Sequence, residues 1–184
     1  MKKIIAVIII VILAGVNVNA QEIKFGAKIG LNYASIVGDN TEQIDPVTSF
    51  NVGVLTEIPI SEKFSFQPEL MYFGQGYNYN DNTISLNYLS IPVIGKYYLI
   101  KGLNLEAGPQ IGFLLYAKND KASTKDLYNS VDFGINFGVG YKLDNGINFG
   151  ARYIYGLTNI NNVEGIVDKN KNVGFQLSIG YFFF

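Results

Sequence analysis

A stretch of thirteen residues in the second half of the chain, VDFGINFGVGYKL (131–143), alternates between two kinds of side chain without interruption. Its odd-numbered positions carry only valine, phenylalanine, isoleucine, tyrosine and leucine, whereas its even-numbered positions carry aspartate, glycine, asparagine and lysine. Successive side chains of a β-strand point to opposite faces, so this pattern predicts a long strand with one apolar face. A helix, with its period of 3.6 residues, would mix the two sets.

Seven further stretches alternate in the same way, although less cleanly. They cover residues 23–33, 50–60, 64–76, 86–99, 103–116, 147–158 and 172–184. Short connectors lie near 61–63, 101–102 and 144–146, and longer polar ones lie at about 35–48, 77–85, 117–129 and 161–171. Eight strands joined by short and long connectors in turn predict an up-and-down meander, with turns at one end and loops at the other.

Four prolines fall inside the expected strands, namely Pro59, Pro68, Pro92 and Pro109. Proline has no backbone N–H to donate to a neighbouring strand. We therefore expect a bulge or a strand end at each of these positions.

The two faces of these strands differ in bulk as well as in polarity. One face carries most of the aromatic and aliphatic side chains, whereas the other interleaves glycine with charged and amide side chains. The narrow interior of an eight-stranded barrel suits the glycine-rich face, and charged residues make up only 16% of the chain, too few to coat a soluble protein. We therefore expect an all-β fold, an eight-stranded antiparallel transmembrane β-barrel, with Tyr33, Tyr97 and Tyr155 in interfacial belts. A secreted soluble β-sandwich is the alternative.

The first twenty residues, MKKIIAVIIIVILAGVNVNA, have two lysines, an apolar core and a small residue at the end. The core is too short to span a bilayer, so the pattern predicts a cleaved signal peptide, with cleavage between Ala20 and Gln21. The expected organisation is a signal peptide at 1–20 and a barrel domain at 21–184. A retained anchor helix is the alternative.

The chain contains no histidine and no cysteine. This composition excludes sites in which histidine activates serine or cysteine, zinc sites of the usual type, and disulfides. An isoelectric point near 5.4 offers no basic surface for nucleic acid. We expect no catalytic residues, no bound metal and no cofactor.

Five segments resemble a known family, namely ELMYFGQG (69–76), YLSIPVIGKYYL (88–99), GPQIGFLL (108–115), GLTNI (156–160) and LSIGYFFF (177–184). They are similar to segments of the porin-like outer-membrane β-barrel family of Bacteroidetes, also called the PorT family or the outer membrane protein β-barrel domain. The resemblance covers nearly all of the chain after the N-terminal segment. It implies an eight-stranded barrel in a bacterial outer membrane but no transport activity, and one type of member assists a protein-secretion system.

If the polar face lines the lumen, nine charged residues lie there: Lys24, Lys28, Glu57, Glu69, Lys96, Glu106, Asp132, Lys142 and Arg152. Isolated charges are costly in a confined interior, so we expect them to pair. The predicted network consists of Lys28, Glu57, Glu69, Lys96, Glu106 and Arg152, supplemented by Gln67, Gln110 and Gln176.

The favoured role of this network is a structural plug, and the alternative is a narrow or gated pore for ions or small solutes. An acid/base pair of Glu57 and Glu69 is a third, enzymatic alternative. Both carboxylates are more simply partners of Lys96 and Arg152.

The function predicted from these features is that of a non-enzymatic outer-membrane barrel with a largely plugged lumen. It acts as a membrane scaffold or as a surface-interaction protein, and an accessory role in protein secretion is a further alternative. Both termini are expected in the periplasm and the polar loops outside the cell, where binding often occurs. The expected partners are outer-membrane lipid, the assembly machinery of that membrane, and an extracellular or secretion-system protein.

The last expected strand, NVGFQLSIGYFFF (172–184), has to pair with the first strand to close the barrel. Its aromatic residues Tyr181, Phe183 and Phe184 are the expected signal for the assembly machinery. Phe183 shares the parity of the lipid-facing residues, whereas Phe184 does not.

Overall fold

The computed structural model describes residues 23–80, 82–119, 122–163, 165 and 168–183. The strands found there are β1 (Lys24–Gly38), β2 (Ile44–Pro59), β3 (Phe64–Tyr79), β4 (Asn82–Tyr98), β5 (Leu103–Asn119), β6 (Ala122–Ser123), β7 (Val131–Lys142), β8 (Ile147–Gly156) and β9 (Asn170–Phe182). A single turn of 3-10 helix, η1 (Lys125–Leu127), follows β6. No helix in the described part of the chain is long and apolar enough to cross a membrane.

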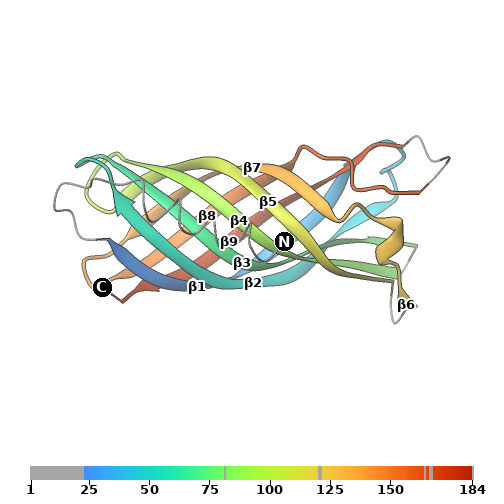
Figure 1. Ribbon diagram of the computed structural model, residues 1–184, viewed down its shortest axis with the longest axis horizontal. Helices are drawn as coiled ribbons and strands as arrows, with labels where there is room; N and C mark the ends of the chain where they lie inside the picture. The colour runs from blue at the N-terminus through green and yellow to red at the C-terminus, as the bar shows by residue number, and fades with distance from the viewer. Residues whose placement is uncertain (1–22, 81, 120–121, 164, 166–167, 184) are drawn as a thin grey trace, which may run out of the picture.

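Eight of these strands form a closed antiparallel barrel, which confirms the predicted fold (Figure 1). Each long strand pairs with the long strands before and after it, and the two-residue β6 only folds back onto β5. β1 pairs with β9 from Gly26↔Phe182 to Gly38↔Asn170, and this seam closes the sheet. Closure pairs the backbone groups of every long strand on both sides, as hydrocarbon surroundings require.

The barrel has two different ends (Figure 1). At one end, which we call the turn end, residues 60–63, 99–102 and 143–146 make short connections. At the other, which we call the loop end, the connections are residues 39–43, 80–81, 120–130 and 157–169.

Two of the four long loops expected from the sequence are mostly strand. The expected loops at 35–48 and 77–85 shrink to the connections 39–43 and 80–81. β3 and β4 stay paired out to Tyr79↔Asn82, and Asn80 makes the tight turn with a φ of 47°. The strands therefore continue as hairpins beyond the stretches of clear alternation, and their backbone groups stay paired.

The expectation of a bulge or strand end at each proline was wrong for three of the four. Pro59 does end β2, but Pro68, Pro92 and Pro109 lie within strands that keep their register. The β3–β4 ladder instead skips the positions between Pro68↔Val93 and Met71↔Ser90, which accommodates the missing donors without a shift. Register shifts occur elsewhere, between Pro46 and Asn51 and between Asn87 and Tyr88.

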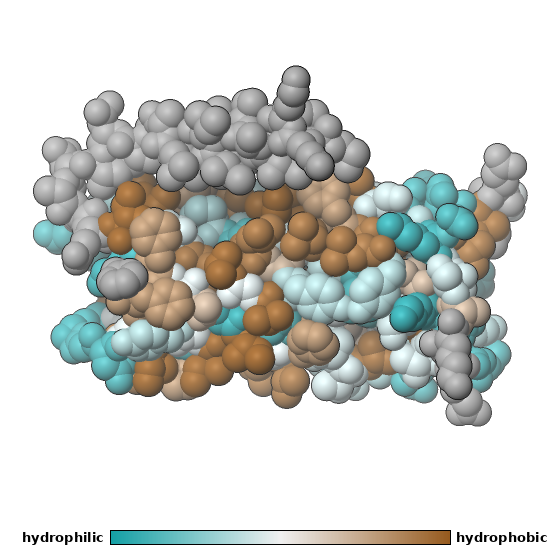
Figure 2. Space-filling view, turned by 60° about the horizontal axis from the view of Figure 1, so that its bottom comes forward, coloured by the Kyte–Doolittle hydropathy of each residue, from teal (hydrophilic) through white to brown (hydrophobic). Residues whose placement is uncertain are grey.

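The outer surface carries the apolar face of the strands (Figure 2). In this view hydrophobic side chains spread over the middle of the barrel, whereas the most hydrophilic ones gather toward its ends. Exposed or half-exposed rings form a loop-end belt of Tyr33, Phe50, Tyr72, Tyr153 and Phe175. A turn-end belt consists of Phe64, Tyr97, Tyr141, Phe149 and Tyr181. Aromatic belts above and below an apolar band mark the two interfaces of a membrane.

Candidate functional site

Charged side chains from seven barrel strands meet inside the lumen. They are Lys28 (β1), Glu57 (β2), Glu69 (β3), Lys96 (β4), Glu106 (β5), Lys142 (β7) and Arg152 (β8). The structure thus brings together all six residues of the predicted network and adds Lys142. The exposed fraction is 0–4% for the six side chains and 19% for Lys142, so the network lies in an enclosed interior.

Glu69 has the most donors of the three glutamates. Arg152 donates two hydrogen bonds to it, from Nη2 to Oε1 at 2.7 Å and from Nη1 to Oε2 at 3.0 Å. Lys28 Nζ lies 2.7 Å from Oε2, and the Gln67 amide donates to Oε1 at 2.7 Å. The guanidinium fork matches both carboxylate oxygens, an arrangement that is stronger than neutral hydrogen bonding and fixes the geometry.

Arg152 also contacts Glu106, and a glycine in β7 lies between the two residues. Arg152 Nε donates to Glu106 Oε2 at 2.5 Å. Gly138 in β7 lies between these residues, because it pairs with Glu106 on one side and with Arg152 on the other. A Cβ on Gly138 would lie 2.7 Å from Cγ of Arg152, so the absent side chain is what lets the arginine lie over β7.

Glu57 collects donors nearer the turn end. Lys142 Nζ lies 2.5 Å from its Oε1, and the Tyr98 hydroxyl donates to the same atom at 2.8 Å. Lys96 Nζ lies 3.4 Å from Oε2. Two cations and one hydroxyl thus surround a single buried carboxylate.

Lys96 connects the two halves of the network. Its ammonium group donates to Gln67 Oε1 at 2.8 Å and lies 3.5 Å from Glu106 Oε1. The ring of Phe182 closes this region, with the Nζ atoms of Lys96 and Lys142 at 5.8 Å and 5.4 Å from its centroid. All seven charges therefore belong to one connected cluster of four cations and three carboxylates.

The sequence placed Lys142 in the lumen but not in the network, and it did not single out Tyr98. Both have a signal in hindsight, since Lys142 has the inward parity of the 131–143 stretch and Tyr98 has that of Lys96. Their contacts with Glu57 depend on the register between strands, and the alternation of side chains within one strand does not determine that register.

The remaining predicted lumen residues take other partners. Gln110 accepts a hydrogen bond from Asn136 at 3.1 Å, and Gln176 is buried where β9 pairs with Arg152. Asp132 is buried without a cationic partner among the described residues, and it accepts from Asn172 at 2.8 Å. Lys24 makes no ion pair with the described part of the chain.

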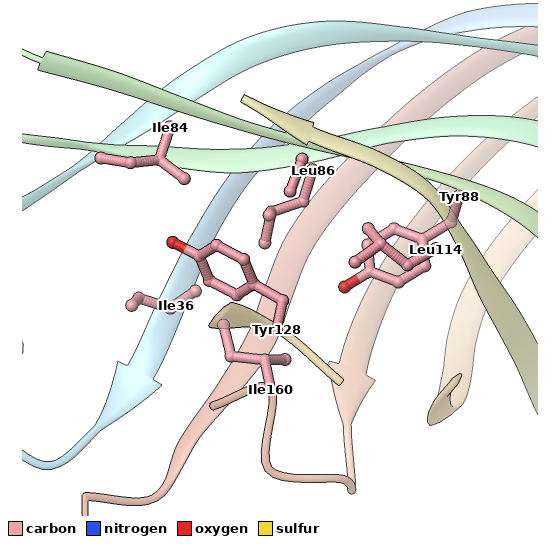
Figure 3. Close-up of a cluster of buried hydrophobic side chains, with 8 residues drawn as sticks. Ile36, Ile84, Leu86, Tyr88, Leu114, Tyr128 and Ile160 are labelled. Carbon is pink, nitrogen blue, oxygen red and sulfur yellow. The ribbon is translucent and has the colours of Figure 1, made fainter. Parts of the chain in front are cut away.

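The loop-end part of the lumen is apolar, contrary to the expectation of a polar interior throughout. Figure 3 shows the side chains that fill it, and the whole cluster consists of Ile36, Ile84, Leu86, Tyr88, Leu114, Ala117, Tyr128 and Ile160. Along β4 the inward residues change from Ile84, Leu86 and Tyr88 near the loop end to Lys96 near the turn end. The lumen thus has an apolar layer above a charged layer.

Two loops supply the outermost part of the apolar layer. Tyr128 and Ile160 come from the connections 120–130 and 157–169 and point into the barrel mouth (Figure 3). The loops bind each other through Asn129 N to Ile160 O at 2.8 Å and Asn162 N to Leu127 O at 2.9 Å. We call this pair of joined loops the cap.

The Tyr128 hydroxyl is anchored inside the cap. It lies 2.9 Å from the hydroxyl of Tyr77 in β3. Burial, followed by the hydrogen bond with Tyr77, raises the pKa of Tyr128, so its hydroxyl stays protonated at neutral pH.

The residues of the predicted assembly signal are only partly within the described chain. Tyr181 and Phe183 point outward and are exposed, and their rings contact each other edge to face at 5.8 Å. Phe184, like Ala20 and Gln21 of the predicted cleavage site, lies outside the described residues.

The three glutamates of this interior are engaged by cationic side chains. No group of three or more potential metal-ligating residues occurs in the described part of the chain. The oxygen atoms of Glu57, Glu69 and Glu106 already accept from cations, so these carboxylates are held as ion-pair partners. What the arrangement does chemically is to tie seven strands together across the lumen.

A closed eight-stranded antiparallel barrel, apolar outside and charged inside, defines an integral β-barrel protein of the bacterial outer membrane. The family model of the outer membrane protein beta-barrel domain matches residues 19–162, and the chain belongs to this family. No curated protein matches the sequence.

Solved structures of outer-membrane proteins share the fold. Neisserial surface protein A matches with a TM-score of 0.61 at 11% identity, over 89% of this chain and 100% of its own. Ail, the attachment invasion locus protein of Yersinia pestis, matches with a TM-score of 0.56 at 15% identity, with the same coverage. At these identities the similarity concerns the fold alone.

Proposed function

We propose that this protein is a non-conducting, non-enzymatic scaffold of the outer membrane that presents its cap to a partner outside the cell. The observation that carries the proposal is the doubly filled lumen, with the apolar layer under the cap and the charged network nearer the turn end. In this orientation the loop end faces the exterior and the turn end faces the periplasm.

A continuous water path would require both layers to open together. Moving the network apart would leave at least one buried charge without a partner, which costs about 3–5 kcal/mol for each broken pair. Opening the apolar layer would expose the side chains around Tyr128 and Ile160 to water.

Planar-bilayer recording tests the closed state. The refolded protein is expected to give no steady single-channel current, in the same lipid in which a large porin conducts. A steady current that disappears in Lys96→Ala or Glu106→Ala would replace the scaffold by the narrow pore, because those side chains would then line the path.

The surface partner is proposed from the cap. Leu127 in η1 and Leu157 after β8 are exposed beside the joined loops, so the cap offers apolar groups on a fixed backbone. Cross-linking in intact cells followed by purification is expected to capture one extracellular or outer-membrane protein. Leu127→Asp with Leu157→Asp should abolish the capture, whereas Ile100→Asp at the turn end should not. Equal capture by the wild type, the double leucine variant and Ile100→Asp would show that the cap does not bind the partner.

The absence of enzymatic activity is proposed from the engaged carboxylates and from the lack of histidine and cysteine. Lipase and protease assays on the detergent-solubilised protein are expected to show no activity above that of Glu69→Gln. Activity lost in that variant would make Glu69 catalytic.

Two finer assignments rest on the sequence. The resemblance of segments such as YLSIPVIGKYYL supports placement in the PorT-type branch of Bacteroidetes, where an accessory role in secretion would appear as lost protein export in a deletion strain. The N-terminal pattern supports removal of residues 1–20, and the intact mass of the membrane-inserted protein should correspond to a chain that starts at Gln21. A start at Met1 would indicate a retained anchor.

A further inference from the structure

A row of hydrogen-bonded polar side chains crosses the outer face of β3, β4 and β5. The hydroxyl oxygens of Tyr72 and Tyr116 lie 2.5 Å apart, and Tyr72 donates to Asn87 Oδ1 at 2.9 Å. Phe50 stacks on Tyr72 with 5.4 Å between ring centroids, so the row lies within the loop-end belt. Polar groups at this level meet the headgroup layer of a membrane.

Two ammonium groups lie beside this row because the chain folds back after β5. β6 pairs with the end of β5 through Lys118↔Ser123. This pairing brings η1, which follows β6, back alongside β5. Lys125 Nζ then donates to the Leu115 carbonyl at 2.9 Å, and Lys118 Nζ lies 5.2 Å from the centroid of the Tyr116 ring. Each amine thus contacts Leu115 or Tyr116, although six residues lie between the two lysines in the sequence.

These two positive charges are not neutralised within the described residues. Neither Lys118 nor Lys125 forms an ion pair there, in contrast to Lys101 at the turn end, whose Nζ lies 2.6 Å from Asp144. Their neighbours are a ring and a carbonyl, which leave most of the ammonium donors free. A phosphate group is the complement of amines whose donors are free.

The outer surface between the two amines and the middle of the barrel is apolar. Phe113 and Leu115 on β5 and Leu70 on β3 are exposed there. Leu115 and Tyr116 are both exposed because the register of β4 and β5 shifts between Asn87 and Tyr88. The ligand therefore has a charged headgroup and an apolar tail, which distinguishes a lipid from a soluble phosphate.

We infer that this face binds the phosphorylated headgroup of an outer-leaflet glycolipid. The phosphate contacts Lys118 and Lys125, the sugar hydroxyls contact the row from Tyr72 to Tyr116, and the acyl chains follow the apolar band. The site shares Lys125 with the cap but includes neither Leu127 nor Leu157, and lipid retention is measured without any protein partner of the cap.

The test uses the full-length protein in phosphatidylcholine nanodiscs that contain bis-phosphorylated lipid A, extracted for native mass spectrometry. The wild type is expected to retain lipid A, and Lys118→Gln with Lys125→Gln should reduce retention about tenfold or more. Tyr116→Phe, which keeps the ring and both amines, should reduce it about threefold. Lys101→Gln removes one positive charge at the turn end and should bind as the wild type does.

Every variant is first shown to be folded by the shift of its band between unboiled and boiled gel samples. Equal retention by the wild type and the folded double lysine variant would overturn the inference, as would equal retention of dephosphorylated lipid A. Displacement of lipid A by millimolar inorganic phosphate would assign the site to free phosphate instead.

Discussion

Glu69 accepts hydrogen bonds from Arg152 and Gln67 and forms an ion pair with Lys28. Its side chain is fully buried in the lumen. Glu69→Gln keeps the shape but leaves Arg152 and Lys28 with a neutral partner. Breaking a buried pair costs about 3–5 kcal/mol, so the variant should unfold at a markedly lower urea concentration. The chain has no tryptophan, so the fraction of compact band on unboiled gels is the measurement.

Glu62→Gln is the matched control for this prediction, because Glu62 is exposed in the turn after β2 and makes no ion pair with the described residues. Its unfolding midpoint should equal that of the wild type. Adding Lys28→Met to Glu69→Gln should recover part of the loss, since one unpaired cation is then removed. A double variant as unstable as the sum of its singles would show that Lys28 and Glu69 are not coupled.

Gly138 is the second residue on which the network depends. A Cβ there would approach the Ala151 carbonyl oxygen at 2.5 Å and Arg152 Cγ at 2.7 Å. Gly138→Ala should therefore destabilise the barrel by about 1–3 kcal/mol, measured by the temperature at which the compact band disappears.

Gly150→Ala is the comparison, because Gly150 in β8 faces the lumen as Gly138 in β7 does. A Cβ on Gly150 would meet only the Ser178 hydroxyl, at 3.0 Å. That side chain can rotate away, so the loss should be smaller than for Gly138→Ala. Equal melting temperatures for the two variants would indicate that Arg152 does not depend on the space above β7.

The sequence was sufficient to predict which charged residues face the lumen but not which of them touch. Lys28 and Glu69 stand on β1 and β3, which are not neighbours, and Lys28 pairs in register with Gly53 of the strand between them. Contact across an intervening strand depends on the curvature of the closed sheet. Side-chain parity is a property of one strand, so it determines orientation but not distance.

At the scale of elements, the alternation predicted the eight strands but missed the apolar layer. In β4 the inward residues Ile84, Leu86 and Tyr88 are as apolar as the outward residues Leu89 and Ile91. The two faces cannot be told apart there by hydrophobicity, and the pattern fits a buried strand equally well. These inward residues pack against the cap. The position of the cap in the barrel mouth cannot be predicted from a local sequence pattern.

Tyr128 is the side chain that fixes the cap to the barrel. Tyr128→Ala removes the ring from the apolar layer and the hydroxyl partner of Tyr77, and truncating a buried ring costs roughly 3–5 kcal/mol. The loss should be local, because the long strands stay paired. Amide hydrogen exchange should therefore speed up within 125–129 and 159–162 and stay unchanged in β7 and β8.

Tyr79→Ala provides the control for the cap, since Tyr79 is exposed at the same end of the barrel. Its exchange pattern should match that of the wild type. If Tyr128→Ala left the exchange of Asn129 and Ile160 unchanged, the bonds between the two loops would hold the cap without the ring. The same variant should remain non-conducting, because the charged network below is intact.

At the scale of the whole molecule, the fold is a consequence of closure. The seam between β1 and β9 is extended at the turn end by Phe183 N, which donates to Phe25 O at 2.7 Å. On the other side of β9, Phe182 N donates to Gly146 O of the 143–146 turn at 2.9 Å. The sequence predicted the pairing of β1 with β9, because the last of eight strands has to pair with the first to close a barrel. It also predicted that Phe183 faces outward, and Phe183 is exposed while Phe182 is buried against Lys96 and Lys142.

Removing the last aromatic residues separates their structural role from the proposed role in assembly. Deletion of Phe184 alone keeps the outward Tyr181–Phe183 pair and the bond to Phe25, so most of the protein should still reach the outer membrane as compact band. Deletion of Phe183 and Phe184 removes both and should reduce the compact band in the outer-membrane fraction more strongly. Phe183→Ala with Phe184 retained separates the two effects, because it keeps the backbone bond and loses only the ring. If this variant assembled as well as the wild type while the double deletion failed, the seam hydrogen bond would matter and the Phe183 ring would not.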